Sequence, residues 1–260
     1  MRDVSPDPAA RKRFSFSRLS NQLIARPTAD EFAATEEISG RRGATRTTTD
    51  GEQAERDPFE LGTLVHAVLA RLTPERCRGL KSKQLDLWIE HAAETLEIDD
   101  DDLIAECREM LEFFLRSRLF GTFKTARELR TEVEFVLPWH VSTESAERKK
   151  GKANPTDSVC HLQGYLDALV CDADERWWIV DYKTNRVPEN ADDYRRLIAE
   201  YAPQLGVYAL AVEQSLNVAP AGMILHLLRT GEDEKLEWNA ARCADAGAWL
   251  DAALISARNT

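Results

Sequence analysis

Several features that would point to other classes of protein are missing from this sequence. No apolar run approaches the roughly 18 residues that a membrane-spanning helix requires, so we expect no transmembrane segment. The amino-terminal residues lack the apolar stretch of a secretory signal, which makes a cytoplasmic location the default expectation. No G-x-x-x-x-G-K-S/T loop occurs, so we expect no Walker-type ATP site in this chain.

Paired cysteines are missing as well. The five cysteines are scattered, odd in number and without a C-x-x-C pair. This layout argues against a disulfide framework, a zinc ribbon and an iron–sulfur cluster, and it predicts separate, buried thiols. The five are Cys77, Cys107, Cys160, Cys171 and Cys243.

Positive charge is in deficit. The net charge is −11 and the sequence pI is near 5.1. A nucleic-acid-binding protein gains much of its affinity from cations that replace counterions at phosphates, so an acidic chain needs another arrangement. Either local basic patches bind the nucleic acid or a partner delivers it, and the sequence leaves both open.

Hydrophobic periodicity predicts an α/β core behind an amino-terminal helical layer. Residues 1–57 have little to bury and are expected to be largely flexible, with a short ordered segment near 14–24; residues 58–260 form the domain. The predicted helices cover residues 58–72, 82–96, 102–117, 191–216 and 241–256. The predicted strands cover residues 132–137, 159–171, 177–182, 223–228 and 234–238. The acidic run at 99–102 is expected to begin a helix, where negative charge is favourable.

Asp167, Asp181 and Lys183 form the arrangement most able to carry chemistry. Asp167 lies within an apolar strand, and Asp181 ends the apolar run that begins at Trp177. Residues two apart in a strand share a face, so Asp181 and Lys183 project together. A hairpin between the two strands would bring Asp167 beside them. The spacing predicts two carboxylates and one ammonium group at a strand end.

Two carboxylates at one place repel each other unless a cation joins them. Mg²⁺ fits because it takes a few oxygen ligands and keeps waters that a substrate phosphate can displace. Lys183 would stay protonated beside the carboxylates and could steady a phosphate or an attacking water. From spacing alone, a plain ion-pair cluster at a strand edge remains the alternative.

Four motifs occur in order along the chain: Leu61-Gly-Thr-Leu-Val-His66, Gly164-Tyr-Leu-Asp167, Asp181-Tyr-Lys183-Thr184 and Tyr201-Ala-Pro-Gln204-Leu-Gly-Val-Tyr208. Together they resemble the RecB-type branch of the PD-(D/E)XK nuclease superfamily, which includes the carboxy-terminal nuclease domains of AddA- and RecB-like helicase–nucleases. A further segment, Phe14-Ser-Phe-Ser-Arg-Leu19, resembles the usual beginning of such domains.

This resemblance implies a restriction-endonuclease-like core, a mixed central sheet flanked by helices. It implies that His66, Asp167, Asp181 and the backbone carbonyl of Tyr182 bind Mg²⁺ (or Mn²⁺), and that Asp167, Asp181 and Lys183 are catalytic. It also implies that Gln204 and Tyr208 line the DNA path. Pro203 is tolerated in a first helical turn, so the helix that carries Gln204 and Tyr208 is expected to start there.

The expected activity is metal-dependent hydrolysis of DNA, as an exonuclease on single-stranded ends during double-strand-break repair and recombination. The helicase motor would lie upstream in a longer parent chain or in a separate subunit. Two alternatives remain: a non-catalytic DNA-binding or scaffolding module of the same fold, and a stand-alone exonuclease of the Cas4 kind, to which the cysteine layout gives little support. The basic loop at 148–152 is as consistent with a solvated loop as with phosphate contact. Glu132 and Glu134 are interpreted as a solvated strand face, although one could assist a metal.

Overall fold

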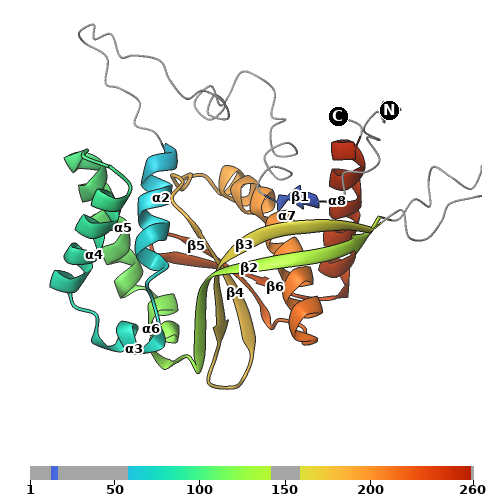
Figure 1. Ribbon diagram of the computed structural model, residues 1–260, viewed down its shortest axis with the longest axis horizontal. Coiled ribbons are helices and arrows are strands. Elements are labelled where there is room, and N and C mark those ends of the chain that lie inside the picture. The colour runs from blue at the N-terminus through green and yellow to red at the C-terminus, as the bar shows by residue number, and fades with distance from the viewer. Residues whose placement is uncertain (1–12, 17–57, 142–158, 259–260) are drawn as a thin grey trace, which may run out of the picture.

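The computed structural model describes residues 13–16, 58–141 and 159–258 (Figure 1). Expectations for residues 17–57, including most of the segment near 14–24, and for the basic loop at 148–152 lie outside the described residues. Cys77, Cys107, Cys160 and Cys171 are buried, as expected, and Cys243 is partly exposed.

The predicted helical layer follows a short strand at residues 13–15 and precedes the other strands, and side-chain caps mark where three of its helices begin. Asp100 accepts hydrogen bonds from the backbone N–H groups of Asp102 (2.9 Å) and Leu103 (3.1 Å), so the acidic run does begin a helix. Two short helices that periodicity did not indicate follow caps at Thr73 and Ser117. The helices are α2 (Pro58–Leu69), α3 (Pro74–Gly79), α4 (Ser82–Thr95), α5 (Asp101–Arg116) and α6 (Arg118–Thr125).

The strands form one mixed sheet of order β1-β3-β4-β5-β6, with β2 paired to β3. The β1–β3 and β4–β5 pairs are parallel, and the β2–β3, β3–β4 and β5–β6 pairs are antiparallel. The predicted hairpin between residues 159–171 and 177–182 is confirmed. The strands are β1 (Arg13–Ser15), β2 (Glu128–His140), β3 (Val159–Cys171), β4 (Trp177–Lys183), β5 (Gly222–Leu227) and β6 (Glu232–Glu237).

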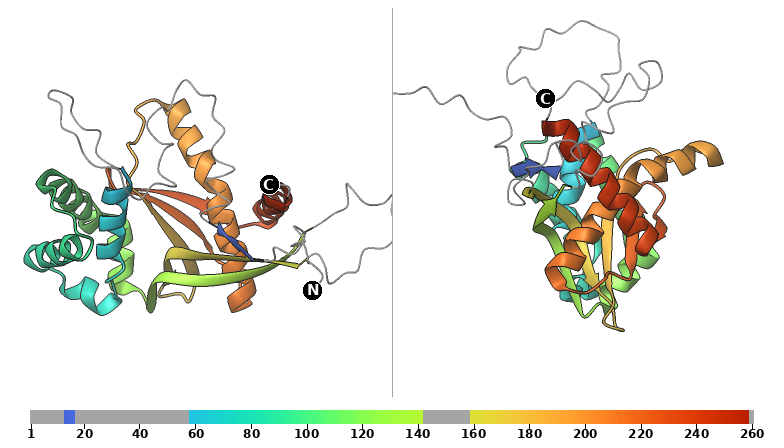
Figure 2. Two further views of the ribbon diagram at one scale, coloured as in Figure 1. Left: turned by 45° about the horizontal axis from the view of Figure 1, so that its top comes forward. Right: turned by 90° about the vertical axis from the view of Figure 1, so that its right-hand side faces the viewer.

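Two remaining helices, α7 (Ala191–Leu216) and α8 (Ala240–Arg258), pack on the sheet face opposite α2–α6 (Figures 1 and 2). The range predicted for α7 is confirmed, but the expected start at Pro203 is wrong. Asn190 caps the true start, and Pro203 lies inside the helix. The apolar stripe from Leu205 to Val212, buried against the sheet, holds the helix together past the missing N–H group.

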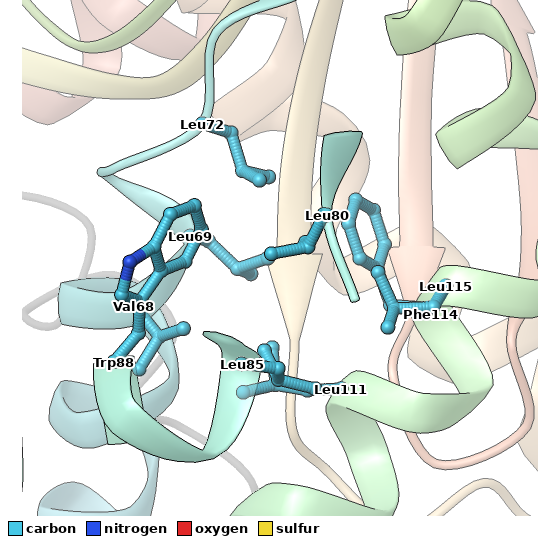
Figure 3. Close-up of a pocket in the computed structure, with 9 residues that line it drawn as sticks. All are labelled: Val68, Leu69, Leu72, Leu80, Leu85, Trp88, Leu111, Phe114 and Leu115. Atoms are coloured by element: carbon cyan, nitrogen blue, oxygen red, sulfur yellow. The ribbon is translucent and has the colours of Figure 1, made fainter. Parts of the chain in front are cut away.

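Each face of the sheet has its own hydrophobic core. One core joins α2–α6 to side chains such as Val170 and Val180, and the other joins α7 and α8 to side chains such as Leu166 and Ile179. A small gap between α2, α4 and α5 is lined only by apolar side chains, Trp88 among them (Figure 3). This gap presents no polar group that could bind a metal or a phosphate, so it is not a candidate active site. Polar side chains gather instead where the sheet meets α2 and α7.

Candidate active site and metal centre

The end of β4 carries the predicted carboxylate–lysine pair. Asp181 is 1% exposed, and its Oδ2 lies 2.8 Å from Nζ of Lys183, which confirms that the two side chains share a face. Apart from this ion pair, Oδ2 of Asp181 has no hydrogen-bond partner among the described residues. This oxygen therefore keeps a lone pair for another ligand.

Asp167 approaches the same place from β3. The register that pairs Ala168 with Val180 sets Asp167 opposite Asp181, as the hairpin predicted. Oδ2 of Asp167 accepts a hydrogen bond from the backbone N–H of Tyr182 at 2.8 Å, which fixes the carboxylate against β4. Its Oδ1 is directed at α2.

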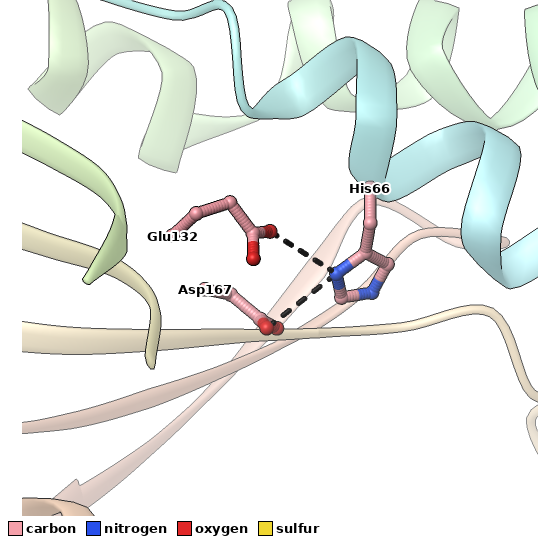
Figure 4. Close-up of side chains that lie close together, drawn as sticks. All are labelled: His66, Glu132 and Asp167. Carbon is pink, nitrogen blue, oxygen red and sulfur yellow. Dashed lines mark ion pairs between the residues drawn. The ribbon is translucent and has the colours of Figure 1, made fainter. Parts of the chain in front are cut away.

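His66 on α2 meets this carboxylate. Its Nδ1 lies 3.4 Å from Oδ1 of Asp167 and 3.9 Å from Oε1 of Glu132 (Figure 4). Ligand atoms of the three side chains all lie within 4.8 Å of one another, and Glu132 is exposed, so the group opens to solvent. One imidazole and two carboxylates at this spacing suit a divalent cation.

Glu132 was interpreted as part of a solvated strand face, and the structure instead places it beside His66. Its φ of 50° lies in the left-handed region, where a non-glycine residue is uncommon and strained. The preceding Thr131 donates a hydrogen bond to the carbonyl of Ala70 on the α2 side, whereas the following Val133 packs against the opposite core. The strained residue thus keeps Thr131 and Glu132 both turned to α2.

The buried groups of the site shift one another's pKa values. Burial raises the pKa of Asp181 to about 6, with Lys183 opposing the rise and Asp167 adding to it. Burial also favours a higher pKa for Asp167, but His66 and Lys183 outweigh it and hold that pKa below its usual value. Burial alone would lower the pKa of Lys183, but Asp181 and Asp167 raise it, so Lys183 is an ammonium group.

The same balance acts on His66 and Glu132. Burial lowers the pKa of His66, but attraction to Asp167 outweighs this effect and raises the pKa above its usual value. Burial and the Asp167 carboxylate raise the pKa of Glu132. A bound cation would relieve the repulsion between these carboxylates, so the donor set fits a divalent metal.

Gln204 and Tyr208 lie four residues apart on α7, and Gln204 contacts Lys183. Nζ of Lys183 donates to Oε1 of Gln204 at 3.3 Å, and Nε2 of Gln204 donates to the Tyr208 hydroxyl at 2.8 Å. Tyr208 is only 4% exposed and packs against Phe16 and Phe135. Sequence reasoning missed this orienting contact with Lys183, although the shared helix face was the available signal.

The ring of Tyr201 adds a further contact that sequence reasoning did not assign. Nζ of Lys183 lies 4.5 Å from the ring centroid, a cation–π distance, and the Tyr201 hydroxyl donates to Asn185 at 2.9 Å. Lys183 is therefore held by a carboxylate, an amide and an aromatic face at once.

A family model for the PD-(D/E)XK nuclease superfamily matches residues 38–258. The chain belongs to this superfamily. The mixed sheet flanked by helices is accordingly a restriction-endonuclease-like fold, as predicted. Within the described residues, none of the helices is long and apolar enough to cross a lipid bilayer.

Relatives of this nuclease chain are much longer proteins. An ATP-dependent helicase/nuclease subunit from Heliobacterium modesticaldum is 31% identical over 182 residues, 68% of this chain and 12% of that protein. The protein of the same name from Lysinibacillus sphaericus is 26% identical over 178 residues, 65% of this chain and 13% of that protein. The chain thus aligns with about an eighth of either relative.

A solved structure shares the fold. A protein from Eubacterium rectale, described as a candidate exonuclease, aligns with all of this chain and 87% of its own at a TM-score of 0.50. At 11% identity this similarity shows the architecture alone.

Proposed function

We propose that the chain is a Mg²⁺-dependent deoxyribonuclease that hydrolyses phosphodiester bonds, with Mn²⁺ as a substitute metal. The observation that carries the proposal is the convergence of two carboxylates and a histidine beside a buried aspartate–lysine pair. In a purely structural ion-pair cluster, each carboxylate would be neutralised by a cation of the cluster. Here the carboxylates Glu132, Asp167 and Asp181 outnumber the fixed cation Lys183, and His66 points its nitrogen at two of them.

The proposed metal ligands are His66, Asp167, Asp181 and the backbone carbonyl of Tyr182, to which the structure adds Glu132 as a candidate. A divalent cation held there supplies a more acidic water and neutralises charge on the scissile phosphate. Tyr182 contributes in a second way, since its N–H holds Oδ2 of Asp167 and leaves Oδ1 directed at the centre.

Lys183 is the proposed catalytic cation. Asp181, Gln204 and Tyr201 fix its position, and its raised pKa keeps it charged. An ammonium group in this place can orient the attacking water and stabilise the negative charge that grows on the phosphate oxygens. Gln204 acts on Lys183 by positioning it, and a direct contact of Gln204 and Tyr208 with DNA remains a proposal from the motif.

The proposed substrate is a single-stranded DNA end, presented by a helicase motor during double-strand-break repair. The names of the relatives support a helicase association, and the aligned eighth of their length leaves room for a motor outside this region. In this proposal residues 58–260 are the nuclease domain, and the motor belongs to a longer parent chain or a separate subunit. The strand is thereby delivered to a chain whose net charge is −11.

A cleavage assay tests the catalytic proposal against a non-catalytic, DNA-binding role. The purified chain is incubated with end-labelled single-stranded DNA and Mg²⁺ or Mn²⁺, with EDTA as the metal control. Lys183→Ala should abolish cleavage, whereas Lys83→Ala, an exposed lysine on α4, should cut at the wild-type rate. A folded wild-type chain that binds but never cuts single- or double-stranded DNA with metal present would establish the non-catalytic role.

A further inference from the structure

The outer halves of β2 and β3 expose one face of the sheet beside the active site. Phe135 of β2 and Leu162 and Leu166 of β3 pack into the core beneath α7 and α8, so the residues that alternate with them face the other way. The helices α2–α6 gather at the opposite end of the sheet (Figure 1), and within the described residues no helix covers this outer face.

The outer face carries an exposed aromatic ring and an exposed aliphatic side chain. Tyr165 and Val136 are each 53% exposed. Tyr165 pairs with Glu134 and Val136 with Gln163 in the β2–β3 register, and Nε2 of Gln163 donates to Oε1 of Glu134 at 2.5 Å across the strands. The exposed Ser15 of β1 lies beside Gln163, so the face is three strands wide.

This face is continuous with the candidate metal centre. Tyr165 precedes Asp167 by two residues on β3, so both side chains point to the same side of the strand, about 7 Å apart along it. Glu134 likewise follows Glu132 by two residues on the neighbouring strand. A strand of DNA whose phosphate reaches Asp167 must therefore pass close to the ring of Tyr165.

We propose that Tyr165 is the stacking platform for a base of single-stranded DNA next to the cleaved phosphate, with Val136 extending the apolar surface. The inference rests on the proposed function, because it takes Asp167 as the position of the scissile phosphate. Aromatic side chains on an open sheet bind single strands by stacking, which tolerates any base sequence. Bases inside a duplex are stacked on each other and cannot use such a ring.

The charges around Tyr165 favour a base over a phosphate as the group in contact. Glu134 lies directly opposite Tyr165 and would repel a phosphate, while a neutral base is not repelled. A chain of net charge −11 also gains little from counterion release, so stacking is a suitable source of affinity. Loss of the ring should then weaken binding without altering its salt dependence.

The test measures binding and cleavage separately on the full chain. Fluorescence anisotropy with labelled oligo-dT in EDTA gives the Kd, and cleavage in Mg²⁺ gives KM and kcat. Tyr165→Ala should weaken binding by roughly tenfold, or about 1.4 kcal/mol, and raise KM by a similar factor with kcat little changed. Tyr165→Phe should bind as the wild type does, and so should Leu87→Ala, which removes an equally exposed side chain from α4.

A second measurement removes the bases instead of the ring. An abasic oligonucleotide should bind the wild type more weakly than oligo-dT, and this difference should shrink in Tyr165→Ala. Equal binding of oligo-dT by wild type and Tyr165→Ala would overturn the inference, as would a wild type that binds no single strand. If the ring instead contacts another part of the chain, Tyr165→Ala would lower thermal stability and leave binding unchanged, which also overturns it.

The outcomes separate this inference from the catalytic proposal. Ring-dependent binding by a chain that never cuts DNA would refute catalysis and leave the stacking role of Tyr165 in place. If cleavage occurs and does not depend on Tyr165, the catalytic proposal stands and the stacking role of Tyr165 is refuted.

Discussion

The affinity of the metal centre for Mn²⁺ should rise with pH, and the steepness should reveal which residues bind the metal. A metal ligand must lose its proton before it coordinates, so protons compete with the metal. His66 has a raised pKa because the attraction of Asp167 outweighs burial. Below that pKa each bound metal displaces a proton from His66. The metal affinity therefore falls by up to about tenfold for each unit by which the pH is lowered.

Asp181 makes a second contribution only if it is a ligand. Burial raises its pKa to about 6, so between pH 7 and pH 5 it passes from mostly ionised to mostly protonated. Competition from the proton at one group with this pKa lowers the metal affinity by about tenfold when the pH falls from 7 to 5. If Asp181 stays with Lys183 and never touches the metal, this contribution is absent.

Mn²⁺ titrations followed by the electron paramagnetic resonance signal of the free ion would measure both contributions at pH 5, 6 and 7. The His66→Gln variant removes the imidazole contribution. Comparison with the double variant His66→Gln/Asp181→Asn then isolates Asp181, while Glu132 and Asp167 are the same in both. Circular dichroism at each pH verifies that the chains remain folded. An identical pH dependence in the two variants would refute the assignment of Asp181 as a ligand.

Three other changes test the site and its support. Glu132→Gln should weaken Mn²⁺ binding at pH 7 by roughly tenfold or more, since it removes an anionic ligand; an unchanged affinity would return Glu132 to the solvated strand face. Gln204→Leu should lower the cleavage rate, because Lys183 loses the amide that positions it. The same change should cost about 1–3 kcal/mol of stability, because the Tyr208 hydroxyl loses its partner. The control Tyr208→Phe keeps the contact between Gln204 and Lys183 and should therefore cut faster than Gln204→Leu. Gly164→Ala should cost about 1–3 kcal/mol in denaturant unfolding, because its Cβ would lie 2.8 Å from an aromatic ring; a stability equal to wild type would show that the ring moves aside.

Local periodicity predicted the parts of the site that neighbouring strands bring together. Asp167, Asp181 and Lys183 lie on two adjacent strands, so a hairpin and the two-residue alternation were enough to place them. Glu132 could not be assigned in this way. Glu132 reaches His66 because α2, more than sixty residues earlier in the chain, lies beside β2. Its backbone also takes a left-handed conformation, which the local sequence does not predict.

Helix rules failed where tertiary packing opposed them. Pro203 suggested a helix start, but Asn190 caps α7 one residue before Ala191, and packing of the stripe around Leu205 outweighs the lost hydrogen bond. The short helices α3 and α6 escaped detection because eight residues or fewer give too little periodicity. Their caps, Thr73 and Ser117, were the readable signal.

The acidic character of the chain, which calls for a source of DNA affinity other than positive charge, is compatible with the arrangement of the site. Without a metal, Glu132, Asp167 and Asp181 would repel a phosphate. We therefore expect the cation to bind before the scissile phosphate can bind at the site. Affinity for the strand must then come from elsewhere, and the ring of Tyr165, two residues from Asp167, offers a source that needs no positive charge. A metal that makes the centre attractive and a ring that holds the base would together let an acidic nuclease bind the strand that a motor delivers.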